Sequence, residues 1–364
     1  MTRTAPQNDF AGGYLRLRHQ RLDRLIQRLL EARGTRGESE LAGLYISDSE
    51  VHALTADRAE AALPIVSEET RNHFLERALR ENCGLDDLDV DLLHAIAAPL
   101  LDEKYLRLYG FLHDNVSRET ATPGLLYGLL AGPGNERHHL LARLQADAPL
   151  RRYGFIELEG ETLGPGIALR PAEAVPLYLS GAGLSAFRRF HPYVPVAPVR
   201  TRLAQERIQV WCVEGPAAAD KSGAARRILG EQGYAVLELN CAACEGLSDE
   251  EFALRSQNTE RIARLYGAAV LLRNLDQVLE TPVRRRSLSE SFADLGGIAA
   301  VALTAVRPLV FHAWLRETFA GARVREHTLE QTGFQKRRQI WEELLPPELQ
   351  GQSELLAARF AFSS

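Results

Sequence analysis

Residues 215–222 read Gly-Pro-Ala-Ala-Ala-Asp-Lys-Ser. An apolar run precedes them at residues 208–213, and residues 224–229 are expected to form a helix. A strand, a loop and a helix in this order are the setting of a phosphate-binding loop with the pattern G-x-x-x-x-G-K-[ST]. In such a loop, backbone N–H groups at a helix N-terminus surround phosphate oxygens, and a lysine adds positive charge. The motif therefore predicts a nucleotide-binding fold.

One position of the motif departs from the pattern, because Asp220 stands where the second glycine belongs. A glycine there lets the backbone approach the phosphates and adopt angles that other residues avoid. An aspartate adds a Cβ and a negative charge, and a carboxylate ~4 Å from a phosphate oxygen costs on the order of a few kcal/mol at an effective dielectric constant near 20. Two interpretations stay open: a loop that binds nucleotide weakly, and a turn between strand and helix that binds no ligand.

Length and composition exclude several classes of protein. The 364 residues suggest two or three domains, and 45% hydrophobic with 25% charged residues is ordinary for a folded globular chain. Four cysteines are too few for a disulfide scaffold, which favours a reducing cytoplasm. The longest apolar runs are too short to span a membrane. A net charge of −5 gives no general attraction to nucleic acid.

The order of expected elements makes this a multi-domain chain with five parts. Residues 1–62 predict a helical N-terminal region, and residues 63–190 predict helices followed by a short hairpin, as in a winged-helix (α+β) domain. A proline-rich linker is expected at residues 191–204. Residues 205–330 alternate strands and helices, which predicts an α/β P-loop NTPase core with a parallel sheet covered on both faces. Residues 331–364 predict two further helices.

The strand expected at residues 268–272 bears on catalysis. In a working P-loop ATPase of this kind, an acidic pair follows this strand, one carboxylate for Mg²⁺ and one for the attacking water. Here the next residues are Arg273 and Asn274. Arginine cannot bind Mg²⁺, and an amide cannot act as a general base. Asp276 would have to reach the metal from the following turn. Losing the general base removes a factor of about 10²–10⁴ in rate, so we expect hydrolysis to be lost.

Several stretches together resemble the nucleotide-binding core of AAA+ ATPases. They are the loop at residues 215–222, the strand end Arg273-Asn-Leu-Asp276 and the stretch Leu303-Thr-Ala-Val-Arg-Pro308. Upstream, three segments are similar to the winged-helix domain that precedes AAA+ modules in a family of bacterial ATPases; they are Asp91 to Tyr105, Arg107 to Asn115 and Asp147 to Phe155. Some members of that family accompany extracellular contractile injection systems. By motif order, the resemblance covers roughly residues 65–360.

The resemblance implies roles for single residues. Gly215 and Lys221 would meet the phosphates of ATP, and Ser222 would bind Mg²⁺ together with the nucleotide. Thr304 would be a polar sensor at the end of the fourth strand, and Arg323 is a candidate arginine finger acting on a neighbouring subunit. The resemblance also implies that residues 331–364 form part of a helical lid, which is truncated where the chain ends.

These implications lead to one expected function and two alternatives. We expect a cytoplasmic, catalytically degenerate AAA+ family module that acts as a scaffold or regulator, with binding of ATP and Mg²⁺ weak or lost. Its expected partners are other protein subunits, in a ring-forming oligomer or a contractile injection apparatus. An active ATPase using Lys221, Ser222 and Asp276 is the first alternative, and a winged-helix regulator that binds nucleic acid is the second. A fragment of a tandem ATPase, a truncated reading frame and a stand-alone remnant all remain open.

Three further motifs favour structural roles. Cys241-Ala-Ala-Cys244 has redox or zinc spacing, but zinc needs two more ligands, so we expect two small buried thiols. The helix expected at residues 123–130 carries no basic residue, and the one at residues 135–144 carries few, which makes nucleic acid an unexpected partner. The leucines and isoleucine of the first helix, near residues 15–29, predict packing on the protein itself with a solvated basic face.

Overall fold

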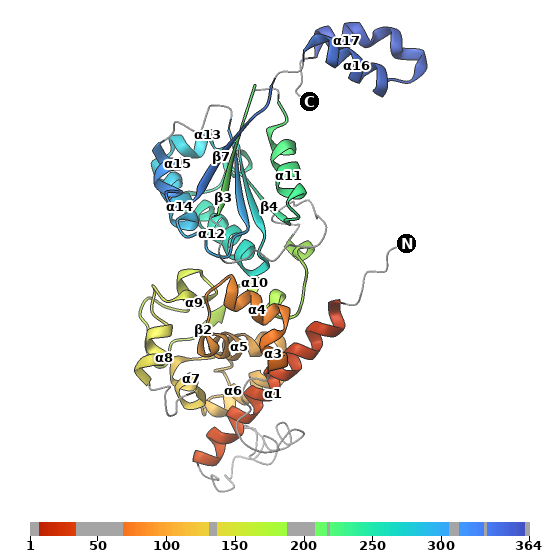
Figure 1. Ribbon diagram of the computed structural model, residues 1–364. Coiled ribbons are helices and arrows are strands. Elements are labelled where there is room, and N and C mark those ends of the chain that lie inside the picture. Colours follow the sequence, from red (N-terminus) through yellow and green to blue (C-terminus); the bar gives the residue numbers. More distant parts are fainter. Residues whose placement is uncertain are drawn as a thin grey trace. The chain divides into compact units, whose positions relative to one another are not determined.

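The computed structural model describes residues 7–33, 68–130, 137–187, 208–216, 219–305, 313–330 and 333–360. The linker expected at residues 191–204 lies outside the described residues, as does the stretch 34–62 of the N-terminal region. The chain divides into two compact units, Met1–Ala186 and Phe187–Ser364 (Figure 1). Within the described ranges, every helix is too short or too polar to span a bilayer.

The first unit is built of helices followed by a hairpin, in the order that the sequence predicts. Its elements are α1 (Gln7–Arg33), α3 (Glu68–Asn72), α4 (Phe74–Glu81), α5 (Asp87–Leu101), α6 (Lys104–Leu112), α7 (Pro123–Leu130), α8 (Arg137–Arg143), α9 (Pro149–Arg152), β1 (Ile156–Leu158), β2 (Leu169–Pro171) and α10 (Ala174–Leu179). The two strands pair antiparallel, with Ile156 opposite Pro171.

Helix α5 forms the centre of this unit. Its side chains from Asp89 to Pro99 are all buried. A capping box begins the helix, since the backbone N–H of Asp89 donates to Asp86 and that of Asp86 donates to Asp89. Helix α1 packs on α5 and α7, and at Gly128 of α7 a Cβ would come within 3.1 Å of the Leu29 side chain. Helix α1 therefore belongs to the same packed unit as α3–α10. The boundary expected between residues 62 and 63 lies outside the described residues.

A buried ionic network joins α1 to α4 and α5. Arg18 is 2% exposed, and it donates to Glu76 at 2.9 Å and to Asp91 at 3.0 Å. The hydroxyl of Tyr14 donates to Glu76 at 2.9 Å and contacts Nε2 of His94 at 2.9 Å. Burial lowers the pKa of His94 well below its ordinary value, which keeps the imidazole neutral. The expectation of a solvated basic face is therefore wrong for Arg18, because carboxylates on two other helices draw its guanidinium into the core.

We expect Arg18→Ala to lower the free energy of unfolding by about 3 kcal/mol, because it leaves Glu76 and Asp91 buried without their shared cation. Arg77→Ala is the control, since the Arg77 and Glu81 side chains are 52% and 45% exposed. An exposed pair of this kind is worth about 0–1 kcal/mol. Urea denaturation followed by circular dichroism measures both changes, and similar losses in the two variants would contradict a structural role for the network.

The second unit is built around a sheet of five parallel strands, as predicted. Its elements are β3 (Gln209–Glu214), α11 (Lys221–Glu231), β4 (Val236–Asn240), α12 (Asp249–Tyr266), β5 (Ala269–Arg273), α13 (Asp276–Glu280), α14 (Pro282–Phe292), β6 (Ala300–Thr304), α15 (Ala313–Thr318), β7 (Arg323–Thr328), α16 (Phe334–Leu344) and α17 (Ser353–Arg359). The strand order is β4-β5-β6-β3-β7, and each neighbouring pair is parallel.

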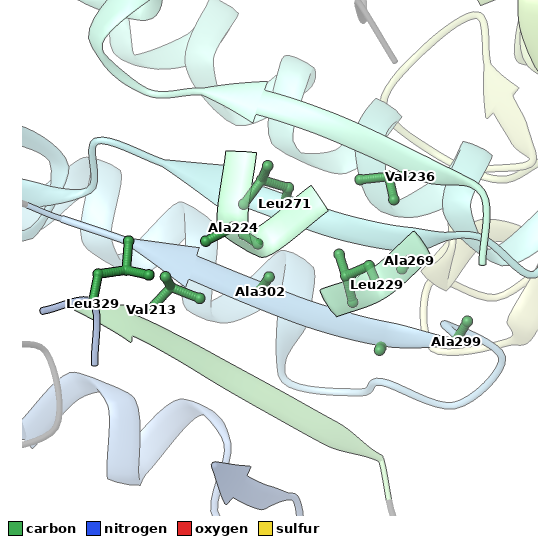
Figure 2. Close-up of a cluster of buried hydrophobic side chains, with 11 residues drawn as sticks. Val213, Ala224, Leu229, Val236, Ala269, Leu271, Ala299, Ala302 and Leu329 are labelled. Carbon is green, nitrogen blue, oxygen red and sulfur yellow. The ribbon is translucent and has the colours of Figure 1, made fainter. Parts of the chain in front are cut away.

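Helices cover both faces of this sheet (Figure 1). Helix α11 packs on one face against the four strands β3–β6, and α12, α14 and α15 lie on the other. Figure 2 shows the core on the α11 side, where Ala224 and Leu229 of the helix face Leu271 and Ala302 of the strands. Strand β6 is buried along its whole length. Because such strands are covered on both faces, they read in the sequence as continuous apolar runs.

The crossovers decide where this sheet can accept a ligand. The chain leaves β3 for α11 on one face, whereas it leaves β6 for α15 on the opposite face. Strands β3 and β6 are neighbours. Ligands of open parallel α/β sheets bind beyond the carboxyl ends of the strands where neighbouring connections diverge in this way. The fold therefore places the loop after β3 at the position expected for a binding site.

Helix α12 is fixed at both ends. A capping box between Ser248 and Glu251 begins it, and Gly267 ends it in a left-handed conformation with φ 57°. Near the carboxyl end, the buried Arg264 donates to the backbone oxygen of Asp294 at 2.6 Å and to Glu260 at 2.6 Å. Desolvation raises the pKa of Glu260 from 4.5 to about 7, against the opposing effect of Arg264.

This raised pKa predicts a pH dependence of stability. Between about pH 4.5 and 7 the folded chain binds more protons at Glu260 than the unfolded chain does. The stability from this group is fully present below about pH 4.5, and it is lost as the pH rises through about 7. Glu260→Gln cannot titrate, so we expect the stability of the wild type relative to this variant to fall between pH 5 and 8. Urea midpoints across that range measure it, and parallel curves would contradict it.

Helices α16 and α17 pack against each other at the C-terminal end of the described chain. Their contact includes Trp341 and Phe360, whose ring centroids are 6.2 Å apart. A turn of 3-10 helix, Pro347–Gln352, connects them. The two helices expected in residues 331–364 are therefore present, and their role as part of a lid stays a prediction.

Candidate functional site

The candidate site lies at the carboxyl edge of the parallel sheet. Val213 of β3 is paired with Thr304 of β6, and Leu303 of β6 is paired with Leu272 of β5. The residues that follow these strands therefore share one edge. They include the loop that begins at Gly215 and the side chains of Arg273 and Asn274, which the sequence singled out.

Gly215 begins the loop, and the packing of the sheet requires a glycine there. Its φ is 155°, and an added Cβ would lie 2.9 Å from Cβ and 3.0 Å from the backbone oxygen of Leu329. Leu329 comes this close because its N–H donates to the backbone oxygen of Glu214 at 2.8 Å, at the end of β7. The glycine thus has a structural reason that is independent of any phosphate.

Lys221 is the first residue of α11, and its ammonium group binds the loop itself. The residue is 7% exposed, and Nζ donates to the backbone oxygens of Pro216 at 2.8 Å and Gly215 at 3.4 Å. The lysine predicted to meet phosphate is therefore directed back onto backbone carbonyls. Ser222, the predicted Mg²⁺ ligand, follows it in the first turn of α11 and is partly buried.

Asp220 caps the N-terminus of α11. Its Oδ1 accepts from the backbone N–H of Gly223 at 2.8 Å. A Cβ added to Gly223 would lie 2.0 Å from Asp220 Oδ2, so the carboxylate lies directly over the first turn. Aspartate is a favoured N-cap, and a negative charge is stabilised at this end of a helix. The carboxylate thus takes a position at which a bound phosphate would accept hydrogen bonds.

A buried carboxylate of β4 engages the arginine that replaces the expected acidic residue. Glu238 is 6% exposed, and it forms ion pairs with Arg273 of β5 and with Arg226 of α11. Both Nε and Nη2 of Arg226 donate to it, at 3.0 and 2.7 Å. Glu238 was not among the residues predicted from the sequence. Its signal is a charged residue between two leucines in the middle of strand β4, since such a residue requires a partner when buried.

Asn274 connects the ends of three strands. Its backbone is left-handed, with φ 55°, a conformation that asparagine tolerates better than most residues. Its Nδ2 donates to Asn240 Oδ1 at 2.8 Å, and its N–H donates to Thr304 Oγ1 at 3.4 Å. Thr304 is 2% exposed. The predicted sensor is therefore a buried acceptor for the neighbouring strand end.

Two predicted residues remain, Asp276 and Arg323. Asp276 is the first residue of α13 and is partly buried. Arg323 begins β7 opposite Gln209, the first residue of β3. It is separated from the loop by the length of β3, roughly 17 Å at about 3.3 Å per residue. Arg323 therefore cannot reach the loop of its own chain, and its action on a neighbouring subunit stays a prediction.

Other candidate motifs have structural surroundings. Cys241 and Cys244 are both buried, and burial raises the pKa of each thiol, which disfavours the reactive thiolate. Over the described ranges, no group of three or more His, Cys, Asp or Glu side chains could hold a metal ion. Helix α7 is mostly buried, and Arg143 of α8 pairs with Asp86 and Asp89. These contacts do not favour a surface that reads nucleic acid.

We expect Arg273→Ala to lower the free energy of unfolding by about 1–3 kcal/mol, because Glu238 then keeps only one of its two cations. Arg273→Asp restores a carboxylate at this position and should cost more, since it places two negative charges side by side. Arg286→Ala removes an exposed arginine of α14 and serves as control, with an expected change within about 0.5 kcal/mol. Denaturation midpoints measure the series, and an Asp variant as stable as the wild type would refute this role for Arg273.

Comparisons with known proteins give likenesses for parts of the chain. One similar structure is described as the structural basis for katanin self-assembly, with a TM-score of 0.32 and 18% sequence identity. The aligned part covers 44% of this chain and 55% of that chain. The FIGL-1 AAA domain in complex with ADP has a TM-score of 0.33 and 17% identity, and it covers 43% and 56%. This chain thus spans about half the length of these structures, and such low scores carry no inference about function. No curated protein matches the chain. Residues 12–169 match the family model of a winged helix domain, variant.

Proposed function

We propose that this chain is a catalytically degenerate module of the AAA+ ATPase type, which acts as a scaffold or regulator in a macromolecular assembly. The observation that carries the proposal is the ion pair between Arg273 and the buried Glu238. Hydrolysis needs a metal-binding carboxylate at the position of Arg273, the last residue of the buried strand β5. A guanidinium group at this position repels Mg²⁺. Removing the guanidinium group would leave the buried carboxylate of Glu238 without one of its two cations.

Asn274, at the position of the water-activating residue, also makes structural contacts. The side-chain amide of Asn274 donates a hydrogen bond to Asn240, and its backbone N–H donates one to Thr304. An amide carries no basic lone pair that could take a proton from water. Asp276 is displaced from the strand end into α13, whose preceding residue Leu275 is held by a bond to the Thr304 backbone oxygen at 3.1 Å. These contacts favour the degenerate module over an active ATPase that uses Asp276.

The nucleotide implied by the resemblance is ATP with Mg²⁺, and Gly215, Lys221 and Ser222 are the residues that would hold it. As folded, the loop does not fit a polyphosphate. The Lys221 ammonium is bound to loop carbonyls, and the Asp220 carboxylate accepts the N–H of Gly223.

The scaffold role extends the resemblance to the whole chain. A winged helix domain followed by a P-loop-type unit is the organisation of the bacterial ATPases to which the sequence is similar. We propose other AAA+ subunits as partners, in a ring-forming oligomer or in a contractile injection apparatus. A role in binding nucleic acid is less favoured, because α7 has no charged residue and Arg143 of α8 is already paired with carboxylates.

We expect the purified chain to release phosphate from Mg²⁺·ATP at the background rate. Lys221→Ala and Asp276→Asn should leave that rate unchanged, because neither residue is part of a working site. A phosphate-release assay measures all three proteins, with an active P-loop ATPase as positive control. Turnover that Lys221→Ala abolishes would overturn the proposal, and turnover that Asp276→Asn also abolishes would establish the active alternative.

A further inference from the structure

We infer that Asp220 is a built-in anion which occupies the phosphate position at the N-terminus of α11, and that this side chain excludes ATP from the loop. The inference rests on the proposed function and deepens it, because it names the group that excludes the nucleotide. Among the groups that make the loop unfit for a polyphosphate, the Asp220 carboxylate is then the one that carries a negative charge.

Three backbone N–H groups of the loop and the first turn of α11 are already hydrogen-bonded within the chain. A phosphate-binding loop offers its backbone N–H groups to the ligand. Here the N–H of Ala219 donates to the Pro216 oxygen at 2.9 Å, and that of Lys221 donates to the Ala219 oxygen at 2.8 Å. The N–H of Gly223 donates to Asp220 at 2.8 Å. These three donors are therefore used inside the loop.

The negative charge of Asp220 also disfavours a phosphate at the N-terminus of α11. The N-terminus of α11 is the positive end of an 11-residue helix, and it favours an anion. Asp220 supplies that anion from within the chain, so the helix gains little from a phosphate. A phosphate at the same place would meet a like charge, which disfavours its binding.

The Asp220 carboxylate lies close against the backbone of Gly223. A Cβ at residue 223 would lie 2.0 Å from Asp220 Oδ2 and 2.7 Å from its Cγ. A side chain at position 223 would require this carboxylate to move. Lys221 completes the closed arrangement, because its ammonium draws the carbonyls of Gly215 and Pro216 toward the helix. The carboxylate and the lysine thus both make contacts within the loop or the first turn of α11.

Calorimetric titration with Mg²⁺·ATP and, separately, with inorganic triphosphate tests the inference on the full chain. The wild type should show no saturable binding at millimolar ligand. Asp220→Asn keeps a favoured cap but removes the charge, and Asp220→Gly removes the whole side chain. Each should gain at least about fivefold in affinity, the lower end of what two like charges ~4 Å apart cost. Lys221→Ala added to Asp220→Gly should abolish the gain.

Asp86→Asn is the matched control, because Asp86 also caps a helix and accepts a backbone N–H, in the first unit. It should leave ATP binding unchanged. The inference is overturned if the wild type binds ATP as tightly as the Asp220 variants. It is also overturned if both variants, with the denaturation midpoint of a folded chain, bind no better than the wild type. The proposed function fails by a separate result, turnover of ATP by the wild type.

Discussion

The carboxylate of Glu238 lies inside the second unit, and a buried charge of this kind needs partners. Two guanidinium groups supply them, one from β5 and one from α11. Removing an ion from water is costly, and only well-placed opposite charges and hydrogen bonds offset that cost. Because Arg273 is one of the two, the last position of β5 serves the stability of the sheet. This requirement links α11 to β4 and β5.

The loop after β3 follows the same principle. In a nucleotide-binding protein, phosphate and metal complete the polar groups at the carboxyl edge of the sheet. Here Asp220 and Lys221 find partners within the loop, and Asn274 finds them at two strand ends. A helix N-terminus, a lysine and a strand end are thus satisfied without a ligand. The carboxyl edge of the sheet is therefore formed as the fold requires, and the side chains of Asp220, Lys221 and Asn274 stabilise it.

The first unit shows buried charge in a different setting. Arg18 of α1 reaches Glu76 and Asp91, which lie 58 and 73 residues further along the chain. Helix α1 is held by these ion pairs as well as by Leu22, Leu25 and Ile26, all buried. A winged helix domain with this helix built into its core agrees with the family match, which begins at residue 12.

The sequence by itself determined the local features. Apolar runs predicted the parallel strands, and the order of strand, loop and helix predicted the loop after β3. Arg273 and Asn274 stand where the resemblance implies an acidic pair. These signals are visible because periodicity and side-chain chemistry are local properties. Only the tertiary structure decided the partners. Glu238 and Arg273 are 35 residues apart, and they meet because β4 and β5 pair in register. The direction of the Asp220 carboxylate and the burial of Arg18 likewise depend on space around them, which no local pattern records.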